Sequence, residues 1–154
     1  MTNLSSDVIK TLQGKTLVTA ESCTGGGIGR ALTAISGSSA VYKGGIISYT
    51  NWVKEKLLGV PGVMLEKYGA ISGPVARAMA EGARKSLQAD IAVSVTGLAG
   101  PGGDEYGNPV GTVFIGYADM TKSYAYEYHF VGDREEVRNQ AIHAALQIIL
   151  EENK

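Results

Sequence analysis

The sequence AESCTGGGIGRAL, residues 20–32, decides how this chain begins to fold. The β-rich run KTLVT comes directly before it, and residues 25–35 have the pattern of a helix. A strand, a glycine-rich turn and a helix in this order form the opening of a βα unit. The turn between them can hold a phosphate, carry a nucleophile, or serve only as a tight connection.

The elements around this turn continue the alternation of helices and strands. Residues 5–15 predict a short helix, with serine or aspartate as its cap and Gly14 as its stop. Strands are predicted over 16–20 and 41–50, and a helix over 51–59 with Asn51 as a possible N-cap. Residues 60–72 have the pattern of a connector with at most one helical turn.

The second half predicts a long helix, a strand, a hairpin and a final helix. Residues 73–90 form the clearest amphipathic pattern, since apolar residues recur every four positions from Val75. A buried strand over 90–97 leads into a loop over 98–109, and a hairpin follows over 110–131. A helix capped by Asp133 closes the chain. We therefore expect an α/β fold, a three-layer α/β/α sandwich with a mixed, mostly parallel sheet.

Composition narrows the class of protein. The 154 residues suit one domain over 1–154, with 44% hydrophobic and 19% charged residues. A net charge of −1 gives no basic surface for nucleic acid, and no apolar run is long enough for a membrane span. The start of the chain has no signal-peptide pattern. Cys23, the only cysteine, cannot form an internal disulfide, so we expect a cytoplasmic protein.

Three segments are expected beyond the carboxyl ends of the strands, where open α/β sheets bind ligands. The first is the turn itself, which matches neither the phosphate-loop spacing nor the dinucleotide fingerprint. Its helix start offers free N–H groups to a phosphate or an oxyanion. From local sequence, a tight turn capped by Ser22 or Thr24 is the favoured interpretation, with Cys23 a small buried residue.

The second segment, SYTNWVK, places Tyr49 and Lys54 around a strand-to-helix junction. The only histidines, His129 and His143, fall in a strand and a helix pattern, which disfavours a Ser-His-Asp triad. A lysine desolvated in a pocket can act as a base instead. From spacing alone, however, Lys54 is more simply a solvated helix lysine like Lys56.

The third segment, TGLAGPGGDEYGNPVG, follows the strand that ends at Thr96. Its glycines are Gly97, Gly100, Gly102, Gly103 and Gly107. Ordering so many glycines between two apolar strands costs conformational entropy. Ligand binding is therefore favoured over a plain flexible connection.

Together these segments resemble the C-terminal domain of the CinA family, the competence-damage-inducible proteins. The matching text is AESCTGG, GGIISYTNWVK, YGAIS, AVSVTGLAGPGG, PVGTVFIG and GDRE, which covers nearly the whole chain in one order. The resemblance is to the stand-alone nicotinamide mononucleotide deamidases in particular. It implies hydrolysis of that carboxamide to nicotinate mononucleotide and ammonia, with no cofactor and no metal.

The resemblance also implies roles for individual residues. Ser22 matches the nucleophile, and Tyr49 and Lys54 match its partners in proton transfer. Backbone N–H groups of Cys23, Thr24, Gly25 and Gly26 would hold the oxyanion. The substrate phosphate would rest on the loop glycines, with Arg134 of GDRE beside it. The family likeness also implies a homo-oligomer that binds a small nucleotide, with no nucleic-acid or membrane partner.

Two departures and two alternatives accompany this hypothesis. The loop end GGDEYGNP and Trp52 differ from the family's pattern, although neither touches the proposed chemistry. A non-catalytic nucleotide-binding module linked to competence or DNA damage would use the same glycine loops. A serine amidase acting on another small amide would use the same nucleophile.

Overall fold

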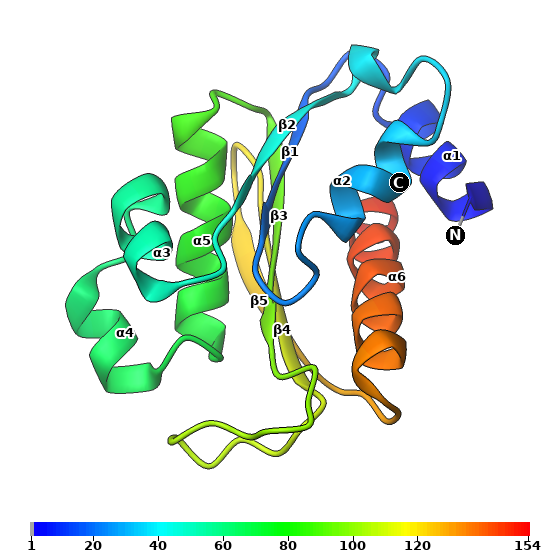
Figure 1. The fold of residues 1–154 in the computed structure, drawn as a ribbon. Helices are drawn as coiled ribbons and strands as arrows, with labels where there is room; N and C mark the ends of the chain where they lie inside the picture. The colour runs from blue at the N-terminus through cyan, green and yellow to red at the C-terminus, as the bar shows by residue number, and fades with distance from the viewer. Residues whose placement is uncertain (1) are drawn as a thin grey trace.

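The computed structural model describes residues 2–154 as a five-stranded sheet covered by helices on both faces (Figure 1). The elements follow in the order α1 (Thr2–Thr11), β1 (Leu17–Glu21), α2 (Gly27–Thr33), the 3-10 turn η1 (Ser38–Ala40), β2 (Tyr42–Ile47), α3 (Asn51–Leu58), α4 (Gly62–Tyr68), α5 (Gly73–Ser86), β3 (Ile91–Gly97), β4 (Thr112–Ala118), β5 (Ser123–His129) and α6 (Arg134–Glu152). Helices α3, α4 and α5 cover one face, and α1, α2 and α6 cover the other. The predicted α/β/α sandwich is confirmed.

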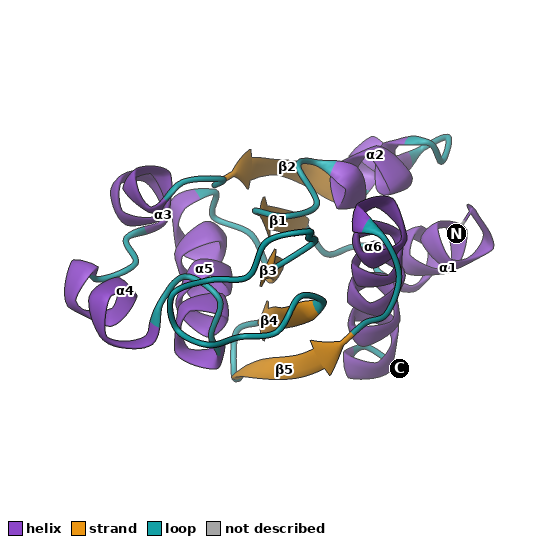
Figure 2. Ribbon diagram, turned by 60° about the horizontal axis from the view of Figure 1, so that its bottom comes forward, coloured by secondary structure: helices purple, strands orange, loops and turns teal. Residues whose placement is uncertain are grey.

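The sheet is mixed and has the strand order β2-β1-β3-β4-β5. Strand β1 pairs in parallel with both β2 and β3, whereas β4 pairs antiparallel with β3 and with β5. The loops that follow β1, β2 and β3 therefore leave the same end of the sheet (Figure 2). This is the end at which the three candidate segments were expected to meet.

The two faces of the sheet bury side chains of different size. Leu17, Val93 and Ile115 lie in the cluster packed against α1, α2 and α6. Alanines such as Ala20 and Ala92 pack against α5, whose Val75, Met79 and Ala83 are fully buried as the amphipathic pattern predicts. Small residues on this face let α5 approach closely: the Ser94 hydroxyl donates to the Ala76 carbonyl at 2.6 Å.

Three local predictions are wrong in detail. Helix α1 begins at Thr2, so Ser5 and Asp7 lie inside it instead of capping it. The N-cap of α3 is Thr50, whose hydroxyl accepts from the Val53 amide, and Asn51 is the first helical residue. Residues 60–72 contain the helix α4, longer than the single turn expected.

Within residues 2–154, no helix combines the length and the apolar character that crossing a bilayer requires.

Candidate active site

Ser22 is fixed by the end of β1. Its amide donates to the Val95 carbonyl at 3.0 Å, so the residue after the strand is still tied to β3. The chain then turns through Gly25 and Gly26, whose φ angles of 58° and 100° are in the left-handed region that side chains disfavour. The glycine-rich turn therefore ends β1 abruptly and leaves Ser22, 7% exposed, at the edge of the sheet.

The start of α2 is occupied by the buried carboxylate of Glu21. This carboxylate accepts from the amides of Ile28 at 2.8 Å and Gly29 at 3.0 Å. It also accepts from the hydroxyl of Thr24 at 2.8 Å. A negative charge at a helix N-terminus is stabilised by the free N–H groups and the helix dipole. The expectation that this helix start offers free N–H groups to a ligand is therefore wrong.

Lys54 reaches Ser22 from the first turns of α3. Its Nζ lies 3.1 Å from the Ser22 Oγ and donates to the Ser48 carbonyl at 2.8 Å. Ser48 is itself held at the end of β2, since its amide donates to the Glu21 carbonyl at 2.7 Å. The ends of the parallel strands β1 and β2 and the first turns of α3 thus bring Ser22 and Lys54 into contact.

Burial gives Lys54 the chemistry of a base. The side chain is 1% exposed, and desolvation lowers the pKa of the ammonium from 10.5 to about 8. A substantial neutral fraction therefore exists near neutral pH. The interpretation of Lys54 as a solvated lysine is wrong, whereas Lys56 on the same helix is exposed.

Cys23, the neighbour of Ser22, is not activated. Burial raises the pKa of its thiol to about 11, which outweighs the attraction of Arg138 and Lys54 for a thiolate. The side chain belongs to the core beneath α6, as expected for a small buried residue. Ser22, and not Cys23, is the nucleophile candidate on this turn.

Tyr49 and Arg134 stand together at the rim. The Arg134 guanidinium donates to the Tyr49 hydroxyl at 3.2 Å and to the Gly100 carbonyl at 2.7 Å. Arg134 is the first residue of α6, so this contact joins the segments after β2 and β3 to the last helix. Tyr49 is 59% exposed and makes no hydrogen bond to Ser22 or Lys54 among the described residues.

The loop between β3 and β4 is ordered by its own polar contacts. Asp104 accepts from the amides of Tyr106 and Asn108. The Tyr106 hydroxyl donates to the Glu66 carbonyl of α4 at 2.7 Å, and the Asn108 amide group donates to the Ile71 carbonyl at 3.1 Å. The loop end that departs from the family's pattern is therefore the part that fastens this loop to α4.

These segments enclose a pocket of about 350 Å³ around Ser22 and Lys54. The predicted residues Ser22, Cys23, Tyr49, Lys54, Gly97, Gly100, Gly102 and Arg134 line it. Thr24, Gly25, Gly26 and Gly103 do not. The sequence reasoning missed Asn51, Ala70, Ile71, Thr96, Leu98 and Ala99, all of which line it too. Asn51 and the YGAIS segment lie in the motifs that resemble the CinA family, and those motifs could have indicated them.

In the part of the chain that the structure describes, no group of three or more histidine, cysteine, aspartate or glutamate side chains is placed to hold a metal ion. His129 on β5 and His143 on α6 are both exposed and lie outside the pocket. The proton-transfer groups that the pocket offers are therefore Ser22, Lys54 and Tyr49.

The fold and this site define a class: a three-layer α/β/α domain with a buried serine–lysine pair beyond the ends of its parallel strands. The family model described as the CinA C-terminal domain matches residues 1–153. The chain therefore belongs to the CinA family, as its motifs indicated.

Relatives and solved structures agree with this assignment. A CinA-like protein of Parasynechococcus marenigrum is 56% identical over 73% of this chain, and one of Geobacter sulfurreducens is 46% identical over 87%. The chain spans 27% and 32% of those two proteins, about a third of their length. The competence/damage inducible protein CihA of Agrobacterium tumefaciens is 38% identical, with a TM-score of 0.96 over 99% of this chain and 95% of that one. A competence or damage-inducible protein of Enterobacter asburiae is 32% identical, with a TM-score of 0.97 over 99% and 98%.

Proposed function

We propose that this chain is an amidohydrolase that converts nicotinamide mononucleotide to nicotinate mononucleotide and ammonia. The observation that carries the catalytic part is the 3.1 Å contact between the Ser22 Oγ and a lysine whose pKa burial lowers to about 8. The choice of substrate rests on the family resemblance and on a pocket large enough for a small organic molecule with an arginine at its rim.

In this mechanism, neutral Lys54 removes the proton of the Ser22 hydroxyl while Oγ attacks the carboxamide carbon. The tetrahedral oxyanion is held by the backbone N–H of Cys23, since Thr24, Gly25 and Gly26 do not line the pocket. The Gly25 amide is in any case engaged, because it donates to the Ser22 carbonyl at 3.0 Å. Protonated Lys54 then gives its proton to the leaving nitrogen, the carbon–nitrogen bond breaks, and ammonia departs from an ester on Ser22.

Water completes the reaction by the reverse route. Lys54, neutral again, takes a proton from the water that attacks the ester, and returns it to Oγ as the acid leaves. The Ser48 carbonyl holds the lysine in place throughout, since it accepts from Nζ at 2.8 Å. Arg134 bridges Tyr49 and Gly100 and is placed to meet the substrate's phosphate at the rim.

The test is ammonia release from nicotinamide mononucleotide by the full chain in chelator, with Ser22→Ala beside the wild type. We expect release by the wild type and a loss of at least about a thousandfold in the variant, with nucleotide binding retained. Ser36→Ala, which changes an exposed serine outside the pocket, is the matched control.

The other outcomes favour the alternatives. A folded wild type that binds the nucleotide without releasing ammonia points to a binding module. Release from other small amides but not from this one points to a different amidase.

We also propose that the chain forms a homo-oligomer. The exposed apolar side chains of Ile47 and Trp52 support this, and sedimentation tests it.

A further inference from the structure

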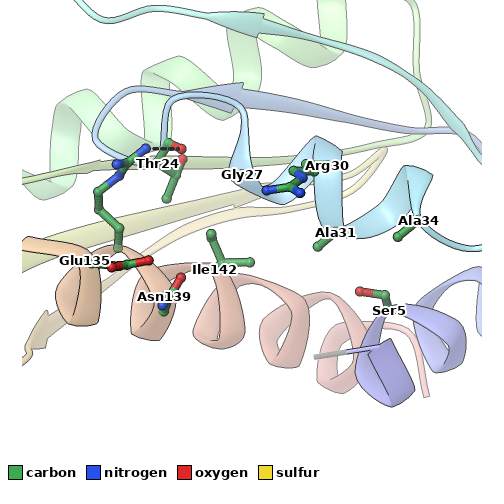
Figure 3. Close-up of a pocket in the computed structure, with 10 residues that line it drawn as sticks. Ser5, Thr24, Gly27, Arg30, Ala31, Ala34, Glu135, Asn139 and Ile142 are labelled. Atoms are coloured by element: carbon green, nitrogen blue, oxygen red, sulfur yellow. Dashed lines mark hydrogen bonds between the residues drawn. The ribbon is translucent and has the colours of Figure 1, made fainter.

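A second pocket, larger than the first, lies between α1, α2 and α6, the helices that cover one face of the sheet (Figure 3). Its volume is about 460 Å³. The turn after β1 separates the two pockets: Ser22 and Cys23 line the first, whereas Thr24 and Gly27 line the second. Nothing in the proposed reaction uses this second pocket.

The lining of this second pocket carries unpaired cationic groups. Arg30 of α2 and Arg138 of α6 both line it, and neither forms an ion pair among the described residues. Among the described residues that line it, Glu135 is the only carboxylate, so the three charged groups of the lining sum to +1. The buried Glu21 carboxylate lies behind the Thr24 hydroxyl and is held by the amides of α2. Guanidinium groups bind carboxylates and phosphates through paired hydrogen bonds. The charge therefore favours an anionic ligand.

The remainder of the lining is apolar and ends in a buried hydroxyl. Ala31, Ala34 and Ile142 form this part, with Ser5 of α1 at the far end (Figure 3). The Ser5 side chain is fully buried, and its Oγ has no hydrogen-bond partner among the described residues. A buried hydroxyl without a partner is unfavourable, and a polar group on a ligand would satisfy it.

Arg138 connects this pocket to the nucleophile's turn. Its Nε donates to the Cys23 carbonyl at 3.0 Å and its Nη2 to the Thr24 carbonyl at 3.3 Å. A Cβ at Gly25 would lie 3.3 Å from Nη2, so the turn is packed tightly on the guanidinium. These two bonds use two of the five guanidinium N–H groups, so an anion that binds the remaining ones would draw the guanidinium away from the carbonyls that hold the residues after Ser22.

We propose that this pocket binds a small carboxylate or phosphate with a short tail, and that the bound anion loosens the Ser22 turn through Arg138. The charged end would lie between Arg30 and Arg138, and the tail along Ala31 and Ala34 toward Ser5. The binding half stands on the pocket alone. The regulatory half rests on the proposed amidase function and makes the anion an inhibitor.

Binding is tested with the full-length Ser22→Ala chain, in which turnover cannot interfere. Inorganic phosphate and 4-hydroxybutyrate, whose terminal hydroxyl is the polar group that Ser5 lacks, are titrated separately while backbone amide NMR signals are followed. We expect saturable shifts in residues 27–34 and 135–142 with at least one probe, and the responding probe identifies the anion class. Arg30→Gln should weaken binding about threefold to fivefold, and Glu135→Gln should strengthen it by a similar factor.

Arg134→Gln is the control, because Arg134 lines only the first pocket and its loss should leave this binding unchanged. The binding proposal is overturned if neither probe gives saturable shifts, if Arg30→Gln and Glu135→Gln bind alike, or if the shifts map to residues 97–102 instead.

Regulation is tested by wild-type ammonia release at saturating probe, where kcat should fall about threefold or more and KM should change less. Unchanged release at saturation overturns the link through Arg138. If the wild type releases no ammonia at all, the proposed function fails while the binding result stands.

Discussion

A lysine ammonium that is almost fully buried beside a serine hydroxyl carries a free-energy cost that an exposed lysine does not. In Lys54 this cost appears as the lowered pKa, and the same burial supplies a base at physiological pH. In the proposed mechanism the site therefore gives up stability for reactivity, as functional sites often do. Both consequences can be measured on one substitution, Lys54→Met, which shortens the side chain by one atom and removes its charge.

The pH dependence of ammonia release should report this lysine. Because the neutral form is the base, kcat/KM should rise with pH and level off above about pH 8, with a tenfold fall per pH unit well below it. Lys54→Met should lose about 100- to 10,000-fold in kcat/KM and lose this limb of the profile. An unchanged profile in the variant would remove Lys54 from the mechanism.

Lys54→Met should raise the free energy of unfolding while it lowers activity. The pKa is lower in the folded chain, so the unfolded chain binds more protons between about pH 8 and 10.5, and the free energy of unfolding rises with pH through that window. Below about pH 8 the full cost is present, roughly 3 kcal/mol for this shift. Since Lys54→Met also leaves the Ser48 carbonyl without its partner, we expect a net gain of about 1–2 kcal/mol at pH 7. Urea unfolding at pH 7 and pH 10 measures this gain, which should shrink at the higher pH.

Cys23 offers a second test at the residue scale. Its thiol stays protonated at neutral pH because burial raises its pKa to about 11, so Cys23→Ala should keep ammonia release within about threefold of wild type. The small cavity left in the core should cost about 1 kcal/mol in urea unfolding. A loss of activity as large as that of Ser22→Ala would contradict the assignment of the serine as nucleophile.

At the scale of elements, the position of Lys54 depends on how closely α3 approaches α5. Gly82 of α5 faces the end of α3, and a Cβ there would lie 1.8 Å from the Leu58 carbonyl oxygen. A glycine inside a helix normally lowers its stability by up to about 1 kcal/mol relative to alanine. Here the glycine instead permits the backbones of two helices to touch.

Gly82→Ala should therefore destabilise the chain by about 2 kcal/mol or more, against the direction of helix propensity, because the backbone of α3 must shift. Gly73→Ala in the same helix is the control. A Cβ at Gly73 would meet the Ala125 Cβ at 3.7 Å, an ordinary contact, so we expect a change within about 0.5 kcal/mol. Equal effects of the two substitutions in urea unfolding would contradict the close approach of α3 and α5.

For the molecule as a whole, the pocket depends on segments that are distant in the sequence. One wall of the pocket comes from the loop between β3 and β4. Tyr106 of this loop holds it to α4 by donating a hydrogen bond to the Glu66 carbonyl. The Tyr106 ring also packs against Gly69, where a Cβ would come within 2.6 Å of the ring. The loop and α4 therefore form one wall, fixed by contacts outside the pocket.

Tyr106→Ala should loosen this wall and raise the KM for the nucleotide about tenfold, with a smaller effect on kcat, since Tyr106 does not touch Ser22 or Lys54. Tyr106→Phe keeps the ring on Gly69 and loses the hydrogen bonds of the hydroxyl to the Leu65 and Glu66 carbonyls, so its KM should rise less than about threefold. Steady-state kinetics on both variants measures this. A change confined to kcat would mean that the loop acts on the chemistry instead.

The sequence by itself determined the order of elements, the three-layer architecture and the family. Alternation of apolar residues and glycine-marked turns are local properties, so the burial of Val75 and Met79 on α5 and the strand end before Ser22 could be predicted from neighbours in the chain. The grouping of Ser22, Tyr49 and Lys54 came from the family's motifs, and spacing alone pointed away from Lys54.

Only the tertiary structure decided which of two similar lysines is buried, what occupies the start of α2, and where the cavities lie. Lys54 and Lys56 stand on one short helix, and the face that α3 turns toward the ends of β1 and β2 makes one a base and leaves the other in solvent. Glu21 is the last residue of a fully buried strand, and its carboxylate accepts from the Ile28 amide of α2, seven residues on. The desolvation of Lys54 depends on the ends of β1 and β2, and the shape of the second pocket depends on atoms from α1, α2 and α6. Such long-range packing has no signature in any one segment.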